Sequence, residues 1–199
     1  MENQSFERLG VNRFFHWLGK TAYKLTGWRT EGKPPEIPKA VVIVAHHTSN
    51  WDFPVGLMAS FIWKFTPFWL GKHTLFRWPL SGLLRRLGGI PVDRRASGNI
   101  VEQVAKIFQT REKFLLTITP EGTRKKAQKW KSGFYYIARA AGVPIICAFL
   151  DYKRKVAGIG PVIYPGEDLA ADMQKIREFY NTVTGKYPER AGAVDISPR

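Results

Sequence analysis

The sequence predicts an α/β protein, in which a layered mixed β-sheet is flanked by helices and preceded by an N-terminal amphipathic helical segment. Short apolar runs rich in β-branched residues alternate with longer segments whose apolar residues recur at helical spacing. With 199 residues, 44% of them hydrophobic, the chain is long enough to build one domain around a full core. Such alternation favours strands and helices stacked in layers.

The individual elements follow from these runs and from the residues that end them. Strands are predicted at residues 41–45, 68–70, 114–118, 143–150 and 156–164. Helices are predicted at residues 98–110 with Ser97 as a cap, at 133–141 with Gly142 as the stop, and at 168–183. The basic segment 75–87 is expected to be helix-rich and broken at Pro79.

An amphipathic, membrane-associating segment is predicted at residues 1–33, followed by one α/β domain at residues 34–199. An apolar stripe with a basic opposite face, typical of helices lying in a membrane interface, is formed by Val11, Phe14, Phe15, Leu18, Ala22 and Leu25. The alternative is a surface helix packed on its own core. The proline-rich run at residues 31–38 favours the membrane interpretation, because it would make the helix an appendage.

The charge and the single cysteine limit the partners and the compartment. There are 31 Lys and Arg residues against 16 Asp and Glu, a net charge of +15 that attracts nucleic acid, an anionic leaflet or acidic proteins. Cys147 has no intrachain partner, so a reducing, intracellular location is expected. Residues 1–5 show no secretory signal, and the longest apolar stretch is interrupted by Lys64 and Pro67, so no spanning helix is predicted.

The first candidate catalytic group lies where the predicted strand 41–45 ends. His47 and Asp52 would stand about 140° apart on a continuous helix, but they can meet on a loop that turns into a helix. An imidazole held by a carboxylate is a general base with a fixed tautomer, and an acceptor that brings its own hydroxyl needs no serine nucleophile. The alternative is a structural histidine satisfied by nearby backbone, as we expect for His46.

Two further segments combine glycine with cations. After the strand at 114–118 come Glu121, Gly122, Thr123 and Arg124, in which glycine permits close backbone approach and arginine can grip a phosphate. The segment 88–94 leads from a glycine pair to Arg94. An ordinary turn with solvated cations would explain the first segment, and a surface salt bridge the second.

Four segments, in this order, resemble the motifs of the glycerolipid acyltransferase family, which includes the lysophosphatidic acid acyltransferases. The family's His-x4-Asp, Gly-x-x-x-x-Asp-Arg, Pro-Glu-Gly-Thr-Arg and Val-Pro-Ile motifs match residues 47–52, 88–94, 120–124 and 143–145. Thr119 stands where the family usually has Phe. The match covers residues 40–150, and separate short motifs in the right order and spacing argue against coincidence.

The resemblance implies acyl transfer with His47 as the general base and Asp52 orienting it. The acceptor hydroxyl attacks the thioester directly, so no metal, cofactor or covalent acyl-enzyme is implied. Residues implied to bind the acceptor head group are Arg94, Glu121, Gly122, Thr123 and Arg124, with Lys72 and Lys131 as further contacts. Arg94 and Arg124 are the implied phosphate ligands.

The expected partners are acyl-CoA or acyl carrier protein as donor, a lysolipid as acceptor, and an anionic membrane surface. No nucleic acid is expected, and the expected location is cytoplasmic and peripheral, on the inner face of the membrane. The aromatic residues between 61 and 69 would either line an acyl-chain channel or form core. Two rival functions stay open: a basic, non-enzymatic membrane- or nucleic-acid-binding module, and a thioesterase that uses the same dyad on water.

Overall fold

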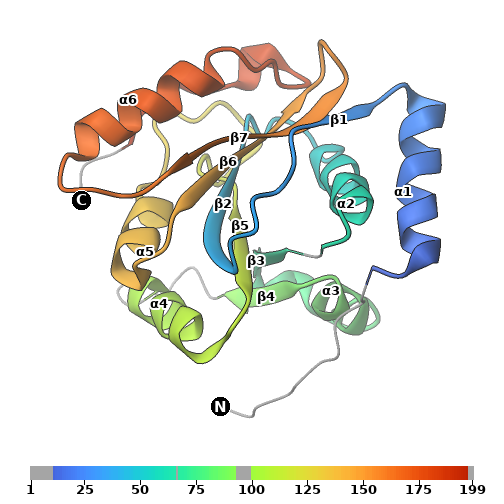
Figure 1. Cartoon of the computed structure of the whole chain (residues 1–199), viewed down its shortest axis with the longest axis horizontal. Coiled ribbons are helices and arrows are strands. Elements are labelled where there is room, and N and C mark those ends of the chain that lie inside the picture. Colours follow the sequence, from blue (N-terminus) through green and yellow to red (C-terminus); the bar gives the residue numbers. More distant parts are fainter. Residues whose placement is uncertain (1–10, 66, 93–99, 197–199) are drawn as a thin grey trace.

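The computed structural model describes residues 11–65, 67–92 and 100–196, in which helices flank a mixed sheet of seven strands (Figure 1). The strands are β1 (Arg29–Glu31), β2 (Lys39–Ala45), β3 (Phe68–Lys72), β4 (Gly89–Val92), β5 (Phe114–Ile118), β6 (Ile145–Asp151) and β7 (Val156–Ile163). The helices are α1 (Arg13–Thr26), α2 (Asp52–Ile62), α3 (Ser81–Arg86), α4 (Ile100–Thr110), α5 (Gly133–Ala141) and α6 (Leu169–Tyr180), with 3-10 turns η1 (His73–Leu75) and η3 (Pro188–Arg190). The predicted α/β class is confirmed.

The strand directions gather several loops at one edge of the sheet. The order is β1-β7-β6-β2-β5-β3-β4. From β6 to β4 all neighbouring strands are parallel, whereas β7 runs antiparallel to β6 and pairs in parallel with the edge strand β1. The carboxyl ends of β6, β2, β5, β3 and β4 therefore share one edge, which is where open α/β sheets bind ligands.

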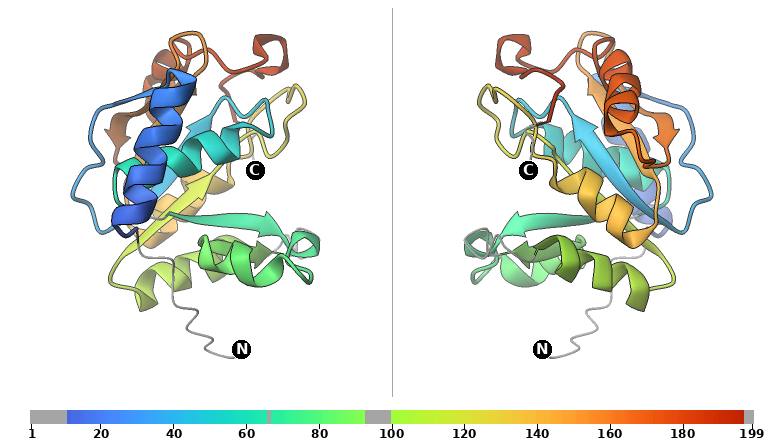
Figure 2. Two further views of the ribbon diagram at one scale, coloured as in Figure 1. Left: turned by 90° about the vertical axis from the view of Figure 1, so that its right-hand side faces the viewer. Right: turned by 90° about the vertical axis from the view of Figure 1, so that its left-hand side faces the viewer.

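The central strand β2 is buried from both sides, as its continuous apolar sequence predicts. Val41 and Ile43 pack in a core with residues of α4, α5 and α6. Val44 belongs to a second core with residues of α1 and α2. Figures 1 and 2 show this arrangement, with α1 and α2 on one side of the sheet and α4, α5 and α6 on the other. Both helix layers thus hold the strand that leads into His47.

Most predicted elements are present with close boundaries. The strand at 114–118 and the helix at 133–141 have the predicted limits, and Gly142 ends that helix in the left-handed region with φ +64°. Asp168 caps α6 by accepting a hydrogen bond from Ala171 N–H (3.0 Å). The short strands β1 and β4 were not predicted, and Ser97 lies outside the described residues.

Helix α1 is packed on the domain. Gly19 is buried where α1 crosses α2, and a Cβ there would stand 2.8 Å from Met58 O. The tilted rings of Phe15 and Phe61 pack together with centroids 5.0 Å apart, and Tyr23 donates a hydrogen bond to Val55 O (2.9 Å). The helix therefore uses part of its apolar stripe to bind α2, which is the packing expected of a surface helix.

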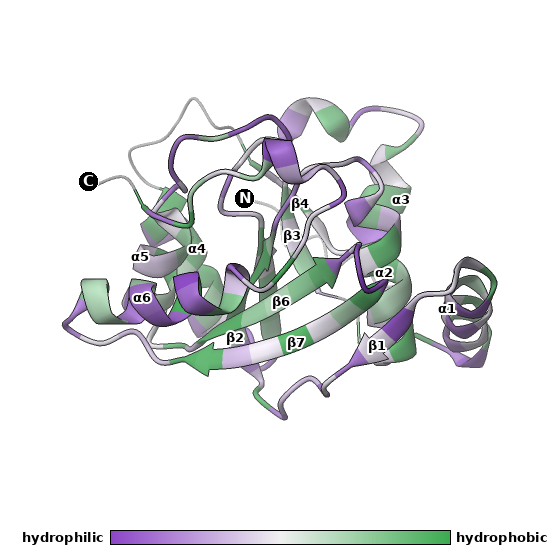
Figure 3. Ribbon diagram, turned by 90° about the horizontal axis from the view of Figure 1, so that it is seen from above, coloured by the Kyte–Doolittle hydropathy of each residue, from purple (hydrophilic) through white to green (hydrophobic). Residues whose placement is uncertain are grey.

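The outer face of α1 keeps bulky apolar side chains in solvent. Phe14 and Trp17 are each 58% exposed, and Leu25 is 81% exposed. Figure 3 shows α1 at the end of the molecule, beyond α2 and β1, with hydrophobic and hydrophilic residues on it. In the described part of the chain no helix combines the length and hydropathy needed to cross a bilayer.

The segment between α1 and β2 ties the N-terminal part to the sheet. β1 falls within residues 1–33 and pairs with β7 through Arg29, Thr30 and Glu31. In the proline-rich run 31–38, Glu31 belongs to β1, and residues 32–38 have no helix or strand, as predicted. Because β1 is part of the sheet, a boundary at residue 33 does not divide two separately packed units.

Candidate active site

The loop after β2 brings His47 and Asp52 together. His47 Nδ1 and Asp52 Oδ2 are 2.9 Å apart. The Asp52 side chain is 4% exposed and the His47 side chain 19% exposed. The carboxylate is thus buried behind the imidazole, and the imidazole is the member of the pair that solvent and substrate can reach.

Local backbone hydrogen bonds explain why the loop takes this shape. Asp52 is the first residue of α2, where the helix N-terminus favours a carboxylate. Its Oδ2 accepts hydrogen bonds from the backbone N–H groups of Thr48 and Ser49, each at 3.0 Å. Ser49 Oγ in turn accepts one from Trp51 N–H (3.1 Å). The carboxylate therefore folds the loop back on itself and fixes the position of His47.

Tyr152 completes the set of donors to this carboxylate. It follows β6, whose carboxyl end lies beside that of β2, and its hydroxyl donates to Asp52 Oδ1 at 2.7 Å. Burial raises the pKa of the Tyr152 hydroxyl far above its ordinary value, and the hydrogen bond to Asp52 raises it further. Tyr152 was not predicted from the sequence. The signal was its position just after the predicted buried strand 143–150, because residues that follow parallel strands lie at the same edge of the sheet as His47.

Glu121 lies beneath the dyad loop. Its side chain is 3% exposed, and its Oε1 accepts a hydrogen bond from the backbone N–H of His47 (3.1 Å). Burial raises the pKa of this carboxyl to about 7, against the opposing effect of backbone hydrogen bonds. The structure therefore joins Glu121 to the backbone of the dyad, a contact that the predicted head-group role did not include.

The neighbouring His46 points into the interior. It is 8% exposed, and its Nε2 lies 3.2 Å from Tyr180 O, so Nε2 carries a proton and donates it. Burial lowers the pKa of this imidazole. These contacts confirm the interpretation of His46 as a structural residue and separate it from the partly exposed His47.

The remaining residues of the loop after β5 turn outward. Gly122 has φ +64°, and a Cβ there would come within 3.1 Å of the Lys131 side chain, so glycine suits both the backbone and the contact. Thr123 Oγ1 accepts a hydrogen bond from Lys125 N–H (3.2 Å). Arg124 is exposed. The exposed Lys131 side chain therefore lies beside Gly122.

The two other predicted cations belong to β3 and to the segment after β4. Lys72 ends β3 and is exposed, at the same sheet edge as His47. Arg94 lies outside the described residues. Of the aromatic residues between 61 and 69, Phe61 and Phe68 are buried at 2% and 7% exposure, so these two are core. Trp69 is partly buried and packs its ring on Phe53 (5.3 Å between centroids).

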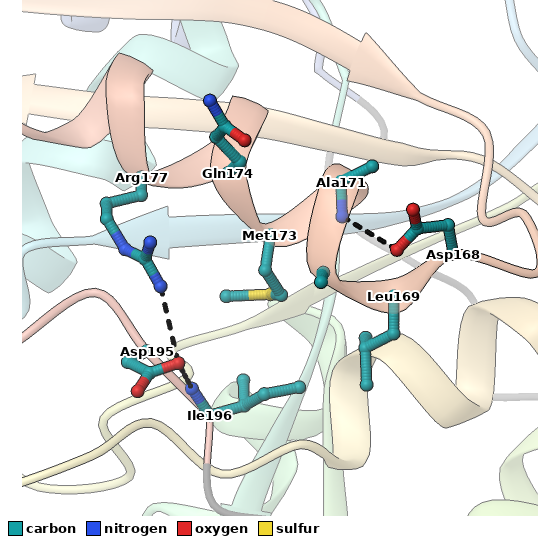
Figure 4. Close-up of a pocket in the computed structure, with 9 residues that line it drawn as sticks. Asp168, Leu169, Ala171, Met173, Gln174, Arg177, Asp195 and Ile196 are labelled. Carbon is teal, nitrogen blue, oxygen red and sulfur yellow. Dashed lines mark hydrogen bonds and ion pairs between the residues drawn. The ribbon is translucent and has the colours of Figure 1, made fainter.

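A surface pocket of about 600 Å³ lies elsewhere, between α6 and the C-terminal residues Asp195 and Ile196 (Figure 4). Arg177 reaches across it to Asp195 at 3.4 Å. None of the predicted site residues lines it. The described residues also contain no cluster of three or more His, Cys, Asp or Glu placed to hold a metal ion.

Comparison with known proteins finds the family that the motifs suggest. Residues 30–150 match the Acyltransferase family. The chain is 33% identical over 147 residues to the 1-acyl-sn-glycerol-3-phosphate acyltransferase of Escherichia coli, covering 68% of this chain and 58% of that protein. It is 28% identical over 140 residues to the Haemophilus influenzae protein of the same name, covering 65% and 56%.

A solved structure shows the same fold. The 1-acyl-sn-glycerophosphate (LPA) acyltransferase PlsC from Thermotoga maritima superposes with a TM-score of 0.59 at 17% identity, covering 84% of this chain and 75% of that one. The chain spans less than three fifths of the length of the curated relatives that it matches. Residues after 150 lie beyond the family match and still contribute Tyr152 to the dyad.

Proposed function

Because this chain belongs to the Acyltransferase family, we propose that it transfers a fatty acyl group from a thioester to the hydroxyl of a lysophospholipid, with His47 as the general base. The observation that carries the proposal is the 2.9 Å contact between His47 Nδ1 and Asp52 Oδ2, with the imidazole partly exposed. The donor is acyl-CoA or acyl carrier protein. The relatives named above suggest 1-acylglycerol 3-phosphate as acceptor.

The hydrogen bonds around Asp52 set the tautomer of the base. Two backbone N–H groups and the Tyr152 hydroxyl all donate to this carboxylate, which accepts at both oxygens. His47 Nδ1 therefore donates its proton as well. Nε2 is left with a lone pair directed away from Asp52, which is the arrangement that a general base needs.

The chemical step follows from this tautomer. His47 Nε2 takes the proton of the acceptor hydroxyl while the oxygen attacks the thioester carbonyl carbon. The carbon–sulfur bond of the tetrahedral intermediate then breaks, and the thiolate leaves and takes up the proton from His47. Asp52 stabilises the imidazolium that forms in between. The oxyanion of that intermediate requires hydrogen-bond donors, a role that we assign to backbone N–H groups of the site.

The other assigned residues surround this base with different tasks. Glu121 accepts a hydrogen bond from the backbone N–H of His47, so we assign it a positioning role. We assign phosphate binding to the cations Arg124, Lys72 and Lys131, whose side chains are exposed. Arg94, which follows β4 in the sequence, is assigned the same role on the resemblance alone.

We propose that the enzyme works at the cytoplasmic membrane surface, with residues 1–33 helping to bind it. Phe14 and Trp17 on the outer face of α1 are half exposed beside Arg13 and Lys20, a combination that suits an anionic interface. Replacing Phe14 and Trp17 by Gln should weaken binding to anionic liposomes several-fold without unfolding the domain, whereas Tyr164→Gln, at another exposed aromatic, should not. Equal binding by all three proteins would refute the interfacial role.

The test of the reaction uses mixed lysolipids and acyl thioesters, with products identified by lipid mass spectrometry. The wild-type chain should form a diacyl lipid, and His47→Ala should lower the rate by at least about a hundredfold. Unchanged transfer by that variant would remove His47 as the base. Free fatty acid released without lysolipid, as fast as with it, would identify a thioesterase instead.

A basic binding module is the second alternative. The net charge of +15 favours it. Such a module has no use for an imidazole held at 2.9 Å by a buried carboxylate. Liposome or DNA binding without any acyl transfer, at all donors and acceptors tried, would favour this reading.

A further inference from the structure

The segment after α6 crosses the carboxyl edge of the sheet and is fastened there. Thr184 O accepts a hydrogen bond from Tyr152 N–H (2.9 Å), and Thr48 Oγ1 accepts one from Tyr187 N–H (3.1 Å). Gly185 between them is buried, and a Cβ there would stand 3.1 Å from Thr48 Oγ1 and 3.2 Å from His46 Cβ. The segment is therefore tied to both loops that form the dyad, although it lies beyond the family match.

This attachment places the ammonium of Lys186 among three aromatic rings. Lys186 Nζ lies 5.4 Å from the centroid of the Trp51 ring, 5.7 Å from that of Tyr152 and 6.0 Å from that of Tyr187. The side chain is half-buried. In the part of the chain that the structure describes, no carboxylate forms an ion pair with it. Aromatic faces attract the cation without cancelling its charge.

Tyr152 links the Lys186 ammonium to the His47–Asp52 pair. Tyr152 carries the Lys186 ammonium over its ring and donates its own hydroxyl to Asp52 at 2.7 Å. Trp51, the second ring, belongs to the dyad loop and is 62% exposed. This half-buried ammonium, which pairs with none of the described carboxylates, attracts an anion more strongly than a fully solvated lysine does, because water screens it less.

We propose that Lys186 is a substrate-binding residue that contacts a phosphate group of a substrate beside the dyad. The inference rests on the proposed acyl transfer, whose acceptor and whose CoA donor both carry phosphate. The shared chemistry is a phosphate oxygen accepting hydrogen bonds from the ammonium. The C-terminal segment thereby adds a cation to the site that the family motifs do not contain.

The kinetic test replaces Lys186 by Met, which keeps a long stem on the rings, and by Arg, which keeps the charge. At saturating co-substrate, Lys186→Met should raise the KM of the phosphate-bearing substrate roughly tenfold, with kcat little changed, and Lys186→Arg should largely restore it. Lys153→Met removes the same charge from an exposed lysine next to Tyr152 and should leave both KM values alone. Thermal unfolding of each variant checks that the fold is intact.

Substrates without phosphate distinguish the two sources. If the acceptor phosphate is bound, the effect of Lys186→Met disappears with monoacylglycerol as acceptor. If the donor phosphate is bound, it disappears with an acyl thioester of N-acetylcysteamine. Unchanged KM values for both substrates in Lys186→Met would overturn the assignment. Equal increases in KM in the Met and Arg variants would overturn it as well.

A binding measurement keeps this inference separate from the proposed reaction. Titration calorimetry with CoA and with 1-acylglycerol 3-phosphate needs no turnover. Weaker binding of either compound to Lys186→Met than to Lys153→Met supports the phosphate contact, even if the wild-type chain transfers no acyl group. Equal affinities of the two variants for both compounds would contradict it, whatever the wild-type rate.

Discussion

The loops after β2 and β5 lie at the same edge of the sheet, yet they differ in how their polar groups are held. In the first, Asp52 is buried and accepts hydrogen bonds from two backbone N–H groups, an imidazole and a tyrosine hydroxyl. In the second, Glu121 is buried, but the residues from Thr123 to Lys126 are exposed. One loop is fixed by its own hydrogen bonds, and the other leaves its cations in solvent.

The difference separates two tasks of the proposed site. A general base must already be oriented when the substrate arrives, because a misdirected imidazole loses most of its catalytic effect. Cations that bind a phosphate gain their order from that phosphate and can remain solvated until then. Changes in the fixed loop should therefore act on kcat, and changes in the exposed cations on KM.

The largest effect is expected in the fixed loop itself. The Asp52 carboxylate accepts hydrogen bonds at both of its oxygens. Asp52→Asn replaces one of these oxygens by an NH2 group, which cannot accept, so His47 loses its orientation. We expect kcat to fall about a thousandfold, with a lower melting temperature as well. A variant with normal kcat would show that the hydrogen bonds of this loop are structural only.

The exposed loop should respond differently. Arg124→Gln removes a solvated cation, so we expect the KM of a phosphate-bearing acceptor to rise roughly thirtyfold, while kcat and the melting temperature stay close to those of the wild type. Lys106→Gln, at an exposed lysine of α4, serves as the matched control. A fall in kcat at constant KM would show that Arg124 acts on the chemical step, as His47 does, and would contradict the proposed difference between the two loops.

Tyr152 sharpens the comparison because it belongs to neither loop. Tyr152→Phe removes one hydrogen bond to Asp52 and keeps the ring, so kcat should fall roughly fivefold at an unchanged KM. Tyr23→Phe removes a hydroxyl that donates to Val55 O on the α1 side, and it should reduce stability without altering kcat. Equal kcat values in the two variants would argue against a positioning role for Tyr152.

The smallest effect concerns the pH dependence of stability at Glu121. Its pKa is about 7 in the folded chain and 4.5 ordinarily, so the folded state binds more protons between these pH values. The free energy of unfolding should therefore fall as pH rises from about 4.5 to about 7. Glu121→Gln stays neutral and can still accept from His47 N–H, so the difference between wild type and variant should vary with pH in this window. Plots of unfolding free energy against pH that run parallel for wild type and Glu121→Gln would contradict the raised pKa of Glu121.

The sequence predicted what periodicity and local chemistry determine. The continuous apolar run of β2 and the helix α5 with its stop at Gly142 follow from short-range patterns, whereas the pairing of His47 with Asp52 was implied by the family resemblance. The short strands β1 and β4 depend on partners far along the chain, so nothing in their own three or four residues marks them.

The site residues that the sequence did not reveal are those assembled by the tertiary fold. Tyr152 and Lys186 lie 100 and more residues after Asp52, and only the strand order β6-β2 and the returning C-terminal segment bring them near it. The buried position of Glu121 is of the same kind. The motif identifies Glu121, but the group that donates a hydrogen bond to its side chain, the backbone N–H of His47, comes from a different loop.

The central claim is that Asp52 holds His47 with a proton on Nδ1 and a free lone pair on Nε2. A long-range proton–nitrogen correlation spectrum of the histidine rings, recorded on wild type and on Asp52→Asn, measures this directly. We expect a protonated Nδ1 and an unprotonated Nε2 for neutral His47 in the wild type, and loss of that preference in the variant. A wild-type His47 with its proton on Nε2 would contradict it.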